Sequence, residues 1–197
     1  EATGAKFIPY INFSDNLSFQ QKKMRCFKAA FDTAMSLHQE FDLLIYEMFF
    51  YPGKKVAENL DIPCVRQFSQ PAWNNEMARD VSPIFSLSCK LIDIQMVGKK
   101  KAKQMGLGNN TMIKAILNDK PDLNIVYVPE FFQAHRDTFG ENYIFTKPPL
   151  KPMKSSIIIP YSEMKAPIIY ISLGSILQIK SFYKKCIKAF GNKNVRS

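Results

Sequence analysis

Short apolar runs separated by amphipathic stretches set the pattern of this chain. Three runs show no alternation, which is typical of strands buried in a parallel sheet: residues 43–46, 64–68 and 123–128. A further strand of the same sheet is predicted over residues 142–145. Apolar positions recur near helical spacing before the first run, over residues 17–40, and between the runs, over residues 52–60, 83–105 and 111–117. This alternation predicts an α/β fold with a Rossmann-like, doubly wound parallel sheet.

The flanking segments are less regular. Residues 6–10 predict a short strand, and Ser18 is placed to cap the first long helix. Residues 71–80 show no clear period and hold Trp73, the one tryptophan of the chain. We expect this segment to be irregular.

A stretch dense in proline and lysine, residues 146–156, has the composition of a linker. Beyond it the pattern predicts a strand over residues 168–172, a tight turn and a helix over residues 181–190. We therefore predict a first domain over residues 1–146, a linker over 147–166 and the start of a second domain over 167–197.

The charge balance favours anionic partners. The chain has 197 residues, with 27 lysines and arginines against 17 acidic residues, for a net charge of +10. The basic residues are spread over several predicted elements, which is typical of a solvated surface. A basic module that binds nucleic acid or another polyanion stays open as the alternative function, and it predicts lysines gathered on one face.

Four cysteines lie far apart, without a CxxC pair or histidines at metal-ligand spacing. We expect neither a zinc site nor a disulfide framework, and a reducing cytoplasm fits best. No apolar run reaches the roughly 18 residues of a membrane span. The first residues lack both a signal-peptide pattern and an initiating Met, so we expect a piece of a larger protein.

Glu47 stands directly after the first buried run, DLLIY. Ligands of parallel α/β folds gather at the carboxyl ends of the strands, so a carboxylate there is placed for a functional role. The competing interpretation is a strand-end carboxylate exposed to water or paired with a lysine.

Four segments in this order carry a resemblance to a known family: DLLIYEMFFYPGKKVAENLDIP, LNIVYVPEFFQ, FGENYIF and, after the linker, APIIYISLGSILQIKSFYKKCIKAF. Together they resemble bacterial macrolide-type (MGT) glycosyltransferases of the UDP-glycosyltransferase superfamily. The resemblance implies a GT-B architecture, in which two Rossmann-like domains face each other across a cleft. The chain would hold most of the acceptor-binding domain, without its first strand, and the start of the nucleotide-sugar domain.

The resemblance also implies an activity, an inverting transfer of a hexose from a UDP-sugar to a hydroxyl of a hydrophobic small molecule such as a macrolide or flavonoid. UDP-glucose would be a co-substrate, and no cofactor, metal or nucleic acid is implied. Glu47 matches the position of the acid that orients the catalytic histidine. The turn of Ser172, Gly174 and Ser175 matches the one that approaches the donor diphosphate, although such a turn is also common as a plain strand-to-helix connection.

The sequence departs from the family pattern in two ways. The histidine motif, GHxNP, and the later donor motif with HxG are not in this sequence, and His38 and His135 do not match either. Glu is also one methylene longer than the family's Asp. We therefore expect the chain by itself to be inactive.

Aromatic and soft residues beside the predicted strand ends are candidates for an acceptor pocket. They are Phe49, Phe50, Trp73, Met77 and Phe85. Ordinary core packing is the competing interpretation for each of them.

Overall fold

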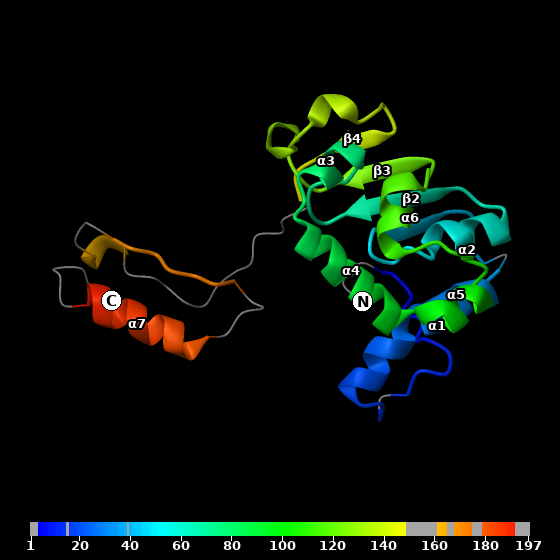
Figure 1. Cartoon of the computed structure of the whole chain (residues 1–197), viewed down its shortest axis with the longest axis horizontal. Helices are drawn as coiled ribbons and strands as arrows, with labels where there is room; N and C mark the ends of the chain where they lie inside the picture. Colours follow the sequence, from blue (N-terminus) through cyan, green and yellow to red (C-terminus); the bar gives the residue numbers. More distant parts are fainter. Residues whose placement is uncertain are drawn as a thin grey trace. The chain divides into compact units, whose positions relative to one another are not determined.

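A computed structural model describes most of the chain as two compact units, Glu1–Pro149 and Leu150–Ser197 (Figure 1). The described residues are 4–14, 16–38, 40–148, 161–164, 168–174 and 179–191, without the side chains of Phe85, Ser86, Asp93 and Met96. The predicted linker, 147–166, lies largely outside these residues, so the predicted domain limits stay predictions.

The described residues of unit 1 form one sheet of four parallel strands. In spatial order these are β1 (Leu44–Glu47), β2 (Cys64–Phe68), β3 (Leu123–Val126) and β4 (Tyr143–Phe145). In the register, Glu47 pairs with Gln67, and Phe68 pairs with Val126. The predicted parallel sheet is confirmed, and its carboxyl edge is formed by residues directly after Glu47, Phe68 and Val126.

β1 lies at one edge of the described sheet, with no described strand on its outer side. Ile45 is 53% exposed, whereas the next residue, Tyr46, points to the opposite face and is 5% exposed. β2 in the interior is buried at four of its five positions. The prediction that the first apolar run is buried on both faces is wrong for β1. An unpaired edge leaves one flank of a strand open to solvent.

Helices α1 (Phe19–Ser36) and α2 (Gly53–Leu60) flank β1 in the sequence. The predicted cap of α1 is confirmed, because the Ser18 hydroxyl accepts from the Gln21 N–H and the Gln21 side chain accepts from the Ser18 N–H. α2 ends at Asp61, which adopts a left-handed backbone at φ 53°.

The predicted helix over residues 83–105 is interrupted. α4 (Pro83–Met96) and α5 (Gly98–Gln104) separate at Gly98, whose φ of +66° an L-residue helix does not accommodate. α6 (Met112–Asn118) starts at its cap, Thr111, close to the predicted position. The segment predicted to be irregular holds a short helix, α3 (Asn75–Arg79), capped by Asn74.

Two predicted strands do not form. Residues 6–10 belong to no strand, and neither do residues 168–172 of unit 2. Both predictions are wrong because an apolar run becomes a strand only when a neighbouring backbone pairs with it. Unit 2 contains the helix predicted there, α7 (Lys180–Phe190), and a single 3-10 turn, η3 (Tyr161–Glu163), among its described residues.

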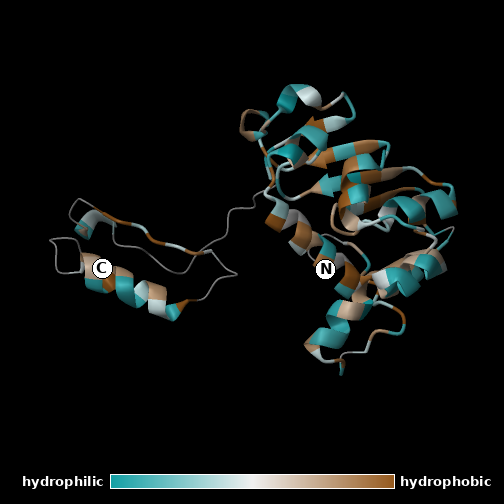
Figure 2. Cartoon of the chain, viewed as in Figure 1, coloured by the Kyte–Doolittle hydropathy of each residue, from teal (hydrophilic) through white to brown (hydrophobic). Residues whose placement is uncertain are grey.

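The described core belongs to unit 1 and lies between the sheet and its helices. Its most deeply buried members include Met48, Val56, Phe68, Met105 and Val126. α4 contacts α1, α5 and α6, and apolar residues recur along its ribbon (Figure 2). Four of its apolar residues are exposed: Ile84, Leu87, Leu91 and Ile94. No described helix is both long and apolar enough to cross a bilayer. All four cysteines are free thiols.

Candidate functional site

An apolar pocket of about 450 Å³ opens at the carboxyl edge of the sheet. The residues directly after β1 and β2 form one side of it, and α3, α4 and α6 supply the rest. Its lining consists of Met48, Phe49, Gln70, Pro71, Trp73, Met77, Cys89, Met112, Ile113 and Ile116. The position is that at which parallel α/β folds bind ligands.

Glu47 organises the turn that leads from β1 into this pocket. Its carboxylate accepts hydrogen bonds from the Phe49 N–H (2.7 Å) and from the Ser69 hydroxyl (3.2 Å). The Phe50 N–H also donates to the Glu47 carbonyl, at 2.8 Å. One carboxylate thus joins the turn after β1 to the loop after β2, and it fixes the backbone of Phe49 at the pocket.

The hydrogen-bond partners of Glu47 are therefore a backbone amide and a hydroxyl. Among the described contacts, neither histidine bonds to Glu47: His38 is exposed at the end of α1, and His135 bonds to Asp80. The family-derived role of Glu47 as the orienting acid of a histidine stays a prediction.

The pocket brings together three of the five residues predicted for acceptor binding, Phe49, Trp73 and Met77. Phe50 instead packs in the core, with its ring stacked on Phe27 at 5.9 Å between centroids. The side chain of Phe85 lies outside the described residues.

Sequence reasoning missed the far side of the pocket. Met112, Ile113 and Ile116 lie on α6, where their spacing of one, three and four residues places them on one face. This spacing in the sequence predicts an apolar face of the helix, but it does not predict that the face lines a pocket. Cys89 of α4 is also part of the lining, and burial raises the pKa of its thiol, which keeps the thiol neutral.

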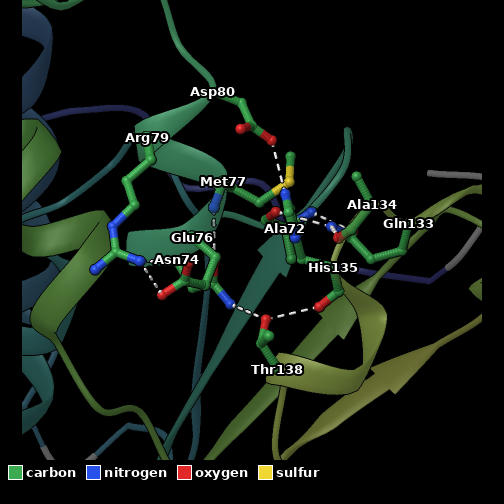
Figure 3. Close-up of polar contacts among 10 residues, drawn as sticks. All are labelled: Ala72, Asn74, Glu76, Met77, Arg79, Asp80, Gln133, Ala134, His135 and Thr138. Carbon is green, nitrogen blue, oxygen red and sulfur yellow. Dashed lines mark hydrogen bonds and ion pairs between the residues drawn. The ribbon is translucent and has the colours of Figure 1, made fainter.

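Side-chain hydrogen bonds hold the segment that contains Met77 on one side of the pocket (Figure 3). Gln133 is 5% exposed and bonds to both backbone groups of Ala72: its Oε1 accepts from the Ala72 N–H (2.8 Å), and its Nε2 donates to the Ala72 carbonyl (3.1 Å). The Gln133 amide thus bonds to Ala72 as the backbone of a neighbouring strand would, because a side-chain amide offers the same donor and acceptor as a peptide group.

The predicted donor-side turn lies in unit 2. Gly174 has a φ of +75°, and its N–H donates to the Ser172 hydroxyl at 3.1 Å. The Leu173 N–H donates to the Tyr183 hydroxyl of α7. Ser175 lies outside the described residues, and the diphosphate-binding role of this turn stays a prediction.

Among the described residues, no three His, Cys, Asp or Glu side chains lie close enough together to hold a metal ion.

No protein-family model matches the chain. Curated relatives do match it. An NDP-glycosyltransferase of Bacillus licheniformis, YjiC, is 30% identical over 155 residues, or 76% of this chain. An uncharacterized UDP-glucosyltransferase of Bacillus subtilis, YdhE, is 27% identical over 162 residues, or 79% of this chain. The chain spans only 37% and 40% of the lengths of these two relatives.

Two solved structures share the fold. The glycotransferase of kitacinnamycin matches 98% of this chain with a TM-score of 0.67 at 20% identity, and the match covers 52% of that protein. CalG4, the calicheamicin glycosyltransferase, matches 86% of the chain with a TM-score of 0.55 at 23% identity, over 43% of its own length. The predicted fold class is confirmed, a Rossmann-like parallel sheet of GT-B type, present as about half of those chains.

The resemblance to nucleotide-sugar glycosyltransferases that the sequence segments carry is therefore confirmed. The similarity runs over about three quarters of the chain. The alternative of a basic polyanion-binding module is not favoured, because these relatives and structures are all named as glycosyltransferases.

Proposed function

We propose that this chain provides the acceptor-binding part of an inverting glycosyltransferase, which moves a hexose from a UDP-sugar to a hydroxyl of a hydrophobic small molecule. The observation that carries the proposal is the apolar pocket of about 450 Å³ at the carboxyl edge of the sheet. Its volume lies within the range of about 300–1,000 Å³ that suits small-molecule sites. The similarity to NDP- and UDP-glycosyltransferases supplies the reaction class.

The chemistry of the lining argues for an aromatic or aliphatic acceptor. Phe49 and Trp73 offer ring faces for stacking, and the methionines adapt to irregular shapes. The Gln70 amide is at the pocket wall, with its Nε2 3.6 Å from the Met48 sulfur, and it is available to orient an acceptor hydroxyl. A macrolide or a flavonoid combines such an apolar body with hydroxyl groups.

Glu47 would support the transfer from the same edge of the sheet. Its carboxylate accepts from the N–H of the pocket residue Phe49 at 2.7 Å, so it lies beside the pocket. In the family's scheme this acid would stabilise the imidazolium of a catalytic histidine as the acceptor hydroxyl loses its proton, and neither His38 nor His135 of this chain matches that histidine. Ser172 and Gly174 would offer a hydroxyl and an N–H group to the donor diphosphate, with UDP-glucose as the expected donor and no metal in the scheme.

Binding of a flavonol tests the acceptor side, because Trp73 is the one tryptophan and lies in the pocket wall. We expect a saturable quenching of Trp73 emission. Phe49→Ala removes an exposed pocket ring and should weaken the affinity about tenfold, equal to about 1.4 kcal/mol. Phe131→Ala is the matched control, since Phe131 is 89% exposed and outside the pocket lining, and it should leave the affinity unchanged.

Quenching that does not saturate, or that responds equally to both phenylalanine variants, would contradict the acceptor proposal. Calorimetric titration with UDP-glucose examines the donor side separately. Flavonol binding without UDP-glucose binding would support the acceptor pocket and count against a donor contact by the turn at Ser172 and Gly174.

A further inference from the structure

Three side-chain ties join the pocket wall at residues 72–80 to the loop at residues 133–138 (Figure 3). The first tie is the buried Gln133 amide on the backbone of Ala72. The other two lie toward the surface and close the segment that contains Trp73 and Met77. The wall of the pocket is therefore held at both of its ends.

The second tie runs through Thr138. The Asn74 side-chain Nδ2 donates to the Thr138 hydroxyl at 2.6 Å, and that hydroxyl donates to the His135 carbonyl, also at 2.6 Å. Asn74 at the same time caps α3, since its Oδ1 accepts from the Met77 N–H at 3.0 Å. None of these groups changes its charge near neutral pH, so this tie is independent of pH.

The third tie is the pair of His135 and Asp80, with 2.7 Å between Nε2 and Oδ2. Asp80 directly follows α3, and His135 lies before the 3-10 helix η2 (Arg136–Thr138). The His135 backbone is left-handed, with a φ of 52°. A non-glycine residue in this region marks a conformation that the surrounding contacts hold in place.

The charges around His135 are mainly acidic. Asp80 and Glu76 face it from the α3 side, and Asp137 faces it from η2. The nearby cations are engaged elsewhere: Arg79 pairs with Glu76, and Arg136 with Glu130. The hydrogen bond to Asp80 raises the pKa of His135 above its ordinary value, and the surrounding acids add to this effect.

We propose that His135 and Asp80 form a proton-dependent latch on the pocket wall, which positions Trp73 and Met77 and so couples the affinity of the pocket to pH. The inference deepens the proposed function, because it assigns a regulation to the same acceptor pocket. His135 and Asp80 are positioning residues, since they act on the pocket through α3 and the segment before it.

The direction of the pH dependence follows from the raised pKa of His135. The folded protein holds the proton on His135 more tightly than the unfolded chain does. The latch is therefore complete below the ordinary histidine pKa of about 6.5, and it weakens as the pH rises through the raised value in the folded protein. Neutral His135 retains a hydrogen bond to Asp80 but loses the charge assistance.

Trp73 emission measured across about pH 6 to about pH 8.5 tests the latch without any ligand. We expect a single transition with a midpoint above about 6.5. Asp80→Asn should lower the midpoint toward the ordinary value and reduce the amplitude, and His135→Asn should abolish the transition. Asn is chosen at 135 because it tolerates a left-handed backbone. His38→Gln is the matched control, because the chain has two histidines and His38 is exposed on another element.

The neutral dye prodan, which accepts energy from tryptophan, tests the coupling to the pocket. Its affinity should fall about fivefold from the lower to the higher pH in the unaltered chain, fall by less in Asp80→Asn and stay constant in His135→Asn. Circular dichroism verifies that each variant is folded. Asp80 is 65% exposed in its side chain, so Asp80→Asn carries the test if the His135 variant does not fold.

The outcomes separate the two proposals. A transition that is absent, that is unchanged in Asp80→Asn, that survives in His135→Asn, or that disappears in His38→Gln overturns the latch. An affinity for prodan that does not change with pH overturns the coupling. If prodan does not bind while the Trp73 transition depends on His135, the latch stands and the acceptor pocket is the proposal that fails.

Discussion

Arg66 is a cation buried in the middle of the sheet, with 2% of its surface exposed. Its Nε donates to the Asn124 Oδ1 at 2.9 Å, and its Nη1 donates to the carbonyls of Ala115 and Ile116 at 3.2 and 3.0 Å. Both carbonyls belong to the last turn of α6, which carries the negative end of the helix dipole, and the Ala115 carbonyl also accepts from the Asp119 N–H at 3.0 Å. Arg66 thus fastens α6, a wall of the pocket, to β2.

Arg66→Met should lower the free energy of unfolding by about 3–5 kcal/mol, because it leaves the buried Asn124 Oδ1 and the Ile116 carbonyl without their Arg66 donor. Arg66→Lys should recover only part of this loss, since an ammonium group lacks the fork that reaches both elements. Urea unfolding gives the measurement. Arg79→Met is the matched control and should cost less than about 1 kcal/mol, because Arg79 forms an exposed pair with Glu76. Equal losses at the two positions would contradict the assigned role of Arg66.

Glu47 gives a second prediction at the residue scale. Glu47→Ala removes the acceptor for the Phe49 N–H and the Ser69 hydroxyl and should destabilise the fold by about 1–2 kcal/mol. Glu47→Gln keeps an oxygen that can accept from Phe49, so it should cost less than half as much. Chemical unfolding of both variants shows whether Glu47 stabilises the turn through its hydrogen bonds or through its charge. If Gln destabilises as much as Ala, the charge of Glu47 is what the turn requires.

At the scale of elements, the break between α4 and α5 depends on one glycine. A Cβ on Gly98 would meet no atom within 4 Å, so any cost of substitution comes from its φ of +66°. Gly98→Ala should destabilise by about 1–2 kcal/mol, and Gly98→Asn by less, since Asn tolerates this conformation. Thermal unfolding measures both. A stabilising Gly98→Ala would instead indicate that the two helices merge into one.

The elements also show what the sequence could and could not predict. β2 matches its predicted limits because it is buried inside the sheet, where an apolar run and a strand coincide. Residues 6–10 and 168–172 have similar composition and no strand partner, which the sequence alone does not reveal. The sequence pattern did not predict α3, because five residues are too few to show a helical period.

Part of the candidate site was predictable from the sequence, as part of the fold was. Phe49, Trp73 and Met77 follow strand ends and were found by position along the chain. The α6 side of the pocket and the contact between Ser69 and Glu47 depend on how distant segments pack. The Gln133 tie spans 61 residues of sequence, so no local pattern signals it.

At the scale of the whole molecule, all residues of the described core lie in unit 1, and α7 of unit 2 buries none of its residues. A chain that ends at Pro149 should therefore unfold thermally within about 3 °C of the full chain, a difference below about 1 kcal/mol. Phe68→Ala, which empties a fully buried position, should cost about 3–5 kcal/mol in both lengths. Equal costs would mean that the core and unit 2 are energetically independent. A large loss on truncation, or a cost of Phe68→Ala that depends on chain length, would instead place part of the stability of unit 1 in residues 150–197.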